Sequence, residues 1–71
     1  MNFLSKKILE YHKKKLAEAQ DNLKYHISRK EQLKDIPENS IESKNQEKMI
    51  KIWSNNVEKI KKEIKKIKEK N

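Results

Sequence analysis

Asp35-Ile36-Pro37-Glu38-Asn39-Ser40 is the only cluster of helix-breaking residues in this chain of 71 residues, and it lies just past the midpoint. Pro37 disfavours helical geometry at the residue before it. Asn39 or Ser40 can cap a following helix, and Glu42 stands three residues after Asn39, as in a capping box. Apolar residues recur with helical spacing on both sides of this cluster. The sequence therefore predicts a single domain, residues 1–71, with helices at about residues 3–34 and 40–69 and a turn at about residues 35–39.

Both predicted helices carry a heptad repeat. In the first helix the core positions a and d hold Leu9, Leu16, Leu23 and Lys30 at a, and His12, Ala19, His26 and Leu33 at d. In the second helix they hold Ile50, Val57 and Ile64 at a, and Trp53, Ile60 and Ile67 at d. When the chain is folded at the turn, each a position meets a d position, for example Leu16 with Ile60, as an antiparallel coiled coil requires. The predicted fold class is all-α, an antiparallel two-helix hairpin that is coiled-coil-like, and we call its a/d stripe the seam.

The composition limits how stable one hairpin can be alone. Charged residues make up 42% of the chain and hydrophobic residues 32%, with no Gly, one Pro and no Cys. A domain this short that lacks disulfides relies on near-ideal helix packing or on oligomerisation. We therefore expect the hairpin to need a partner.

Six apolar residues lie off the seam, all at c or g positions. In an antiparallel pair the g positions of both helices flank the same side of the seam, so these residues share one face of the hairpin, which we call the apolar face: Leu4, Ile8, Tyr11, Tyr25, Met49 and Ile52. A soluble hairpin that exposes such a face is a poor monomer. We interpret this face as the interface of a homodimer that forms a four-helix bundle, and a docking face for a different protein is the alternative.

The positive charge is concentrated at one end of the predicted hairpin. Residues 1–16 carry five Lys and one Glu, residues 54–71 carry seven Lys and three Glu, and residues 17–53 are balanced, so the net charge of +8 lies near the chain ends. Four lysines occupy e positions, where antiparallel helices normally pair opposite charges, and three more widen the same edge. We call these residues the lysine edge: Lys6, Lys13, Lys61 and Lys68, widened by Lys7, Lys14 and Lys62. They form either an anion-binding edge or a solvated surface.

The sequence offers little catalytic chemistry. His12 and His26 are the only histidines, and about 21 Å of helix separates them, so one chain cannot bring both to the same metal ion. The chain has no Gly-rich phosphate loop, no nucleophile triad and no cysteine. We therefore expect no enzyme activity, no metal and no cofactor. The sequence also has no apolar run of signal-peptide or membrane-spanning length, so we expect a cytoplasmic protein without membrane insertion.

These features predict a small, non-enzymatic interaction or regulatory protein that self-associates and binds another macromolecule. The partner that we expect is a protein. Lys, Ile and Asn make up 34 of the 71 residues, which is typical of the AT-rich genomes of low-GC bacteria, their phages and their plasmids. The alternative function is a nucleic-acid-binding accessory protein that uses the lysine edge on DNA or RNA. Because the chain has 18 Lys and one Arg, such binding would be diffuse attraction to phosphates rather than bidentate recognition of bases.

Overall fold

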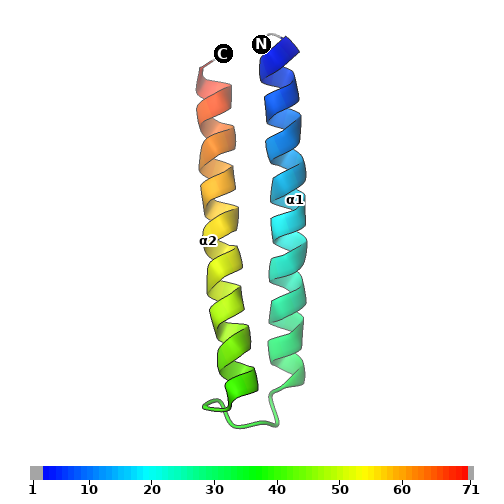
Figure 1. Ribbon diagram of the computed structural model, residues 1–71, viewed down its shortest axis with the longest axis vertical. Coiled ribbons are helices and arrows are strands. Elements are labelled where there is room, and N and C mark those ends of the chain that lie inside the picture. Colours follow the sequence, from blue (N-terminus) through cyan, green and yellow to red (C-terminus); the bar gives the residue numbers. More distant parts are fainter. Residues whose placement is uncertain (1–2, 71) are drawn as a thin grey trace.

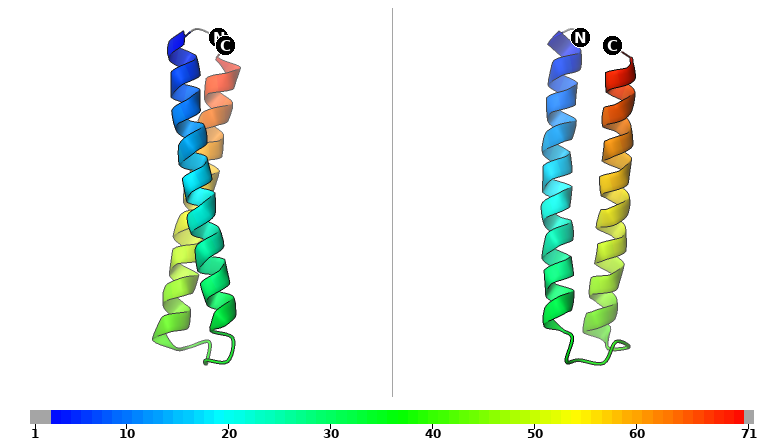
Figure 2. Two further views of the ribbon diagram at one scale, coloured as in Figure 1. Left: turned by 90° about the vertical axis from the view of Figure 1, so that its right-hand side faces the viewer. Right: turned by 180° about the vertical axis from the view of Figure 1, so that it is seen from behind.

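The computed structural model describes residues 3–70 and contains two helices, α1 (Phe3–Gln32) and α2 (Ile41–Glu69). The helices lie side by side and antiparallel, so that Phe3 and Glu69 are at one end, here called the open end, and the turn is at the other (Figure 1). Figure 2 shows that they cross at a shallow angle rather than lying strictly parallel. The Cα atoms span 52 × 14 × 12 Å. The predicted all-α antiparallel hairpin is confirmed.

The first helix ends two residues earlier than the sequence predicted. Leu33 N donates to Lys30 O at 3.0 Å and Lys34 N to Glu31 O at 3.2 Å, so the bonds tighten from i−4 to i−3 after Gln32. Such tightening is common where a helix ends, and here the chain reaches Pro37 a few residues later. The turn therefore runs over residues 33–40 rather than 35–39.

Ser40, rather than Asn39, caps the second helix. Ser40 has an extended backbone (φ −68°, ψ 155°), and its hydroxyl oxygen accepts a hydrogen bond from Ser43 N at 3.2 Å. With Ser40 as the cap, the residue three positions later is Ser43, so the predicted capping box between Asn39 and Glu42 does not form. Glu42 instead lies in the first turn of α2, where its negative charge favours the helix dipole.

The buried side chains of the described residues lie at a and d positions of the predicted seam. Every a and d position named above is buried or half-buried, from Leu9 to Lys30 on α1, at Leu33 just after it, and from Ile50 to Ile67 on α2. The relative position of the helices also agrees with the predicted pairing, because Lys30 Nζ lies 3.2 Å from Glu47 Oε1 across the seam. Residue 30 of α1 and residue 47 of α2 are thus at nearly the same level along the hairpin.

The hydrophobic core of one hairpin is small. Among residues 3–70 the buried hydrophobic residues are Leu9, Ala19 and Val57, at 8%, 2% and 8% exposure, and no large side chain is completely buried. Two helices in one layer leave each helix with a single packed stripe. Neither α1 nor α2 contains an apolar stretch long enough to cross a membrane.

Candidate functional site

The six residues of the predicted apolar face are largely open to solvent. Leu4, Ile8, Tyr11, Tyr25 and Ile52 are between 41% and 68% exposed, and Met49 is half-buried. The face has two parts. The open-end patch is Leu4, Ile8 and Tyr11, all on α1, and the turn-side patch is Tyr25 of α1 with Met49 and Ile52 of α2.

Each patch contains a tyrosine that packs against a histidine of the seam. The rings of Tyr11 and His12 are 5.5 Å apart, those of Tyr25 and His26 are 5.0 Å apart, and both pairs meet edge to face. His26 is held further by Gln46 of α2, whose Oε1 lies 2.7 Å from His26 Nδ1, so that Nδ1–H donates to the amide oxygen. Tyr25 of the turn-side patch therefore packs against a histidine ring that is itself held by a hydrogen bond across the seam.

The lysine edge lacks neutralising partners. Within residues 3–70, ion pairs join Lys15 to Glu18, Lys30 to Glu47, Lys65 to Glu69 and Lys66 to Glu63, and none of these involves a lysine-edge residue. Of the seven lysines in the edge, Lys7 makes a cation–π contact, with its Nζ 4.8 Å from the centre of the Phe3 ring. The seven lysines of the edge therefore carry their positive charge without an ion pair among the described residues.

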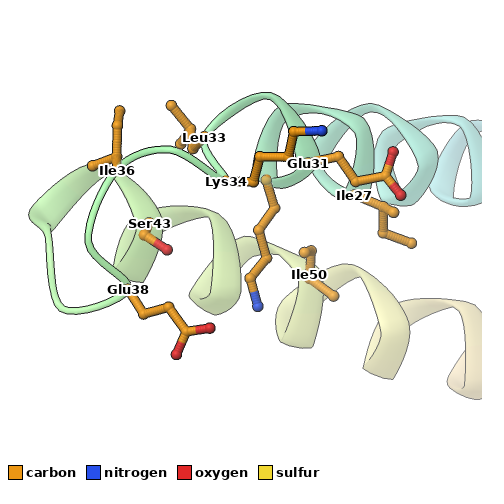
Figure 3. A pocket seen from close by; sticks show the side chains of 9 residues that line it. Ile27, Glu31, Leu33, Lys34, Ile36, Glu38, Ser43 and Ile50 are labelled. Atoms are coloured by element: carbon orange, nitrogen blue, oxygen red, sulfur yellow. The ribbon is translucent and has the colours of Figure 1, made fainter.

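A hollow near the turn was not foreseen from the sequence. It has a volume of about 290 Å³, and its apolar lining comes from both helices and the turn, namely Ile27, Leu33, Ile36 and Ile50 (Figure 3). Charged side chains, including Lys34 and Glu38, stand around it. Ile27 is at an e position, outside the c and g positions that define the apolar face, and it is 43% exposed. Extending the same heptad assignment to the e positions would have placed Ile27 beside the seam, but not the turn residues that complete the hollow.

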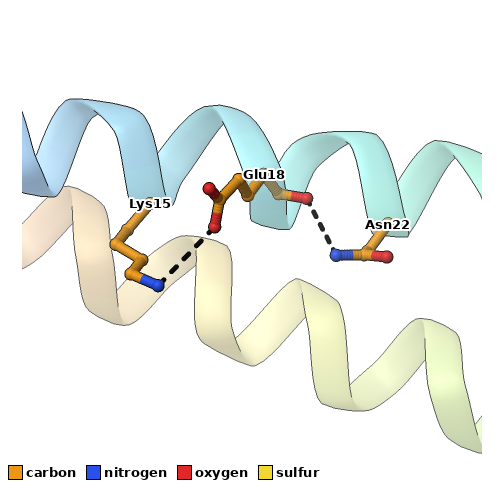
Figure 4. A network of polar contacts seen from close by, with 3 residues as sticks. All are labelled: Lys15, Glu18 and Asn22. Atoms are coloured by element: carbon orange, nitrogen blue, oxygen red, sulfur yellow. Dashed lines mark hydrogen bonds and ion pairs between the residues drawn. The ribbon is translucent and has the colours of Figure 1, made fainter.

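A second hollow, also about 290 Å³, lies between the helices at mid-length, and Trp53 lines it together with Ala19 and the two amides Asn22 and Asn56. The side chains at its rim are held on α1 itself. Lys15 Nζ lies 3.6 Å from Glu18 Oε2, and Asn22 Nδ2 donates to Glu18 O at 3.0 Å (Figure 4). Trp53 Nε1 is buried and has no hydrogen-bond partner within residues 3–70. An unpaired buried N–H is unfavourable.

The two histidines stay on the seam and face different neighbours. Residues 3–70 contain no group of three or more His, Asp or Glu side chains placed to hold a metal ion.

No family model matches this chain, and the searches of curated proteins and of solved structures also found no similar protein.

Proposed function

We propose that the protein is a small, non-enzymatic interaction protein that self-associates through the apolar face and in that form binds another macromolecule. The observation that supports this proposal is the exposure of five large apolar side chains, at 41% to 68%, on one face of the hairpin. Exposed apolar patches mark interaction sites on water-soluble proteins when they are large, and this face carries two of them.

The small core points in the same direction. Leu9, Ala19 and Val57 are the buried hydrophobic residues within residues 3–70, which is little for a hairpin of two long helices. Most helical stability in proteins comes from packing an apolar side against another element. A second hairpin placed on the apolar face would add such packing and make a four-helix bundle, and we infer a homodimer.

The proposal is tested by placing charge on the apolar face. In a variant with Tyr11→Glu and Ile52→Glu, carboxylates would be buried without partners in the dimer, so we expect sedimentation equilibrium to give a monomer mass. The control is Ile41→Glu with Asn55→Glu, which adds the same charge at exposed positions outside the apolar face. The control should keep the mass of the wild type. If the Tyr11 and Ile52 variant keeps that mass as well, the apolar face is not the interface.

A second candidate function is nucleic-acid binding by the lysine edge. The observation that favours it is the grouping of seven lysines, none of them in an ion pair within residues 3–70, in the two chain segments that carry the net charge of +8. Lysines facing one another across e positions repel, and a row of phosphates would relieve that repulsion.

Gel retardation shows whether the lysine edge binds nucleic acid or is only a solvated surface. Binding to duplex DNA, single-stranded DNA or RNA should be strong at about 50 mM salt and fall steeply at higher salt. Lys6→Gln with Lys13→Gln should weaken it, whereas the charge-matched control, Lys34→Gln with Lys48→Gln near the turn, should not. No retardation of any of these nucleic acids at about 50 mM salt would exclude this function.

A further inference from the structure

The two patches of the apolar face lie at different levels along the hairpin. Counting five residues from the Lys30–Glu47 ion pair, backward along α1 and forward along α2, puts Ile52 at the level of Tyr25. The turn-side patch is thus centred near residue 25 of α1, and the open-end patch near residue 8. At 1.5 Å per residue their centres are about 25 Å apart.

The open-end patch has no apolar counterpart on α2. The same count puts Lys66 at the level of Tyr11 and Lys70 close to that of Ile8. Ile8 and Lys70 also line one hollow at the open end. In a parallel face-to-face dimer, α1 of one copy lies over α2 of the other at the same level. That arrangement would press the open-end patch against these lysines.

We propose that two copies pack through their apolar faces in antiparallel orientation, so that the open-end patch of each covers the turn-side patch of the other. This arrangement rests on the self-association proposed above and specifies its geometry. The patches are centred near residues 8 and 25 of α1. The two-fold axis therefore passes α1 midway between them, between Lys15 and Glu18. A two-fold interface uses the same surface on both copies. The apolar face meets this condition because each of its two patches covers the other patch of the second copy.

The charges at that axis are self-complementary. Lys15 and Glu18 are about half exposed and 3.6 Å apart within one chain (Figure 4). Reversing the direction of one α1 about this level brings Lys15 of each copy beside Glu18 of the other. The hollow lined by Trp53, Asn22 and Asn56 lies at the same part of the face, and its polar side chains are therefore at the centre of the interface. Opposite charges facing each other help to fix the register of two packed helices.

The net charge favours the same orientation. The whole +8 lies in residues 1–16 and 54–71, whose described parts form the half of the hairpin nearer the open end. A parallel dimer would gather the charge of both copies at one end. An antiparallel dimer with its axis between Lys15 and Glu18 places the two open ends about 40 Å apart, at about 1.5 Å per residue. That separation exceeds the screening length of about 8 Å at physiological salt, so the two open ends repel each other less than they would in a parallel dimer.

Distances between spin labels test the orientation directly, because the chain has no cysteine of its own. Asn39→Cys places one label on the exposed turn of each copy. The turn is about 20 residues from the two-fold axis, so the antiparallel dimer should give a label-to-label distance of roughly 60 Å. A parallel dimer would hold both turns within the width of two packed helices, about 25 Å.

A second label near the axis provides the control. Ala17→Cys lies at the level of the two-fold axis, on an exposed part of α1 outside the apolar face, so it should give a distance within about 25 Å in either orientation. A short distance at both sites would overturn the antiparallel arrangement and leave self-association intact. No measurable distance at Ala17, together with a monomer mass, would overturn the self-association on which the arrangement rests.

Discussion

Val57→Ala should destabilise the protein by about 1.5 to 3 kcal/mol. Val57 is 8% exposed and lies on the seam at the level of Ala19, which is 2% exposed. The substitution removes two methyl groups, worth about 1.6 kcal/mol at about 0.8 kcal/mol for each buried carbon, and the cavity left between the helices adds to that loss. Urea unfolding followed by the helical circular dichroism signal measures the change in free energy of unfolding.

Ile41→Ala is the matched control for this change. Ile41 is 75% exposed at the start of α2, so its loss should alter the free energy of unfolding by no more than about 0.5 kcal/mol. Both substitutions replace a β-branched residue by alanine and therefore share the gain in helix propensity. The two variants must be compared at one protein concentration, because association contributes to measured stability. Equal losses at Val57 and Ile41 would refute the seam as the main packed contact within the hairpin.

Three further predictions follow from the turn, the seam and the lysine edge. Ser40→Ala should lower the free energy of unfolding by about 0.5 to 2 kcal/mol, because the hydroxyl caps α2, and Asn39→Ala should change it much less; a larger loss at Asn39 would place the cap there. Gln46→Ala should lower the free energy of unfolding by about 1 kcal/mol in the wild type and hardly change it in a His26→Leu background, since the amide oxygen of Gln46 bonds to His26. Equal losses in both backgrounds would show that this bond contributes nothing to stability. Lys13→Glu should raise the melting temperature at low salt, with the gain disappearing as salt is added; a salt-independent change would mean that repulsion along the lysine edge is not its cause.

The fold could be predicted from the sequence because several signals agree. The heptad positions fix which side of each helix is shielded, and Leu9 and Val57 are buried as that pattern requires. The single breaker cluster fixes where the chain reverses. The exact helix ends could not be predicted, because Asn39 and Ser40 are both good caps and the choice depends on the backbone geometry reached after Pro37. Only the structure shows that the hydroxyl of Ser40 lies within reach of Ser43 N.

The candidate surfaces were predictable to a lesser extent. Off-seam heptad positions placed Leu4 and Ile52 on the exposed apolar face, and both are exposed. The hollow near the turn was missed because it combines Ile27 with Ile36 of the turn, and a heptad repeat gives no position to residues outside the helices. Which lysines remain unpaired was also not predictable, since an i,i+3 or i,i+4 spacing permits an ion pair without enforcing it.

The mass of the wild-type protein in solution tests the central claim most directly. Sedimentation equilibrium at micromolar concentration, with helical content measured on the same sample, should give twice the chain mass of 8.6 kDa for a folded protein. A mass of 8.6 kDa for a sample that is fully helical and unfolds cooperatively would show that one hairpin is stable with its apolar face in water, and would contradict the proposed self-association.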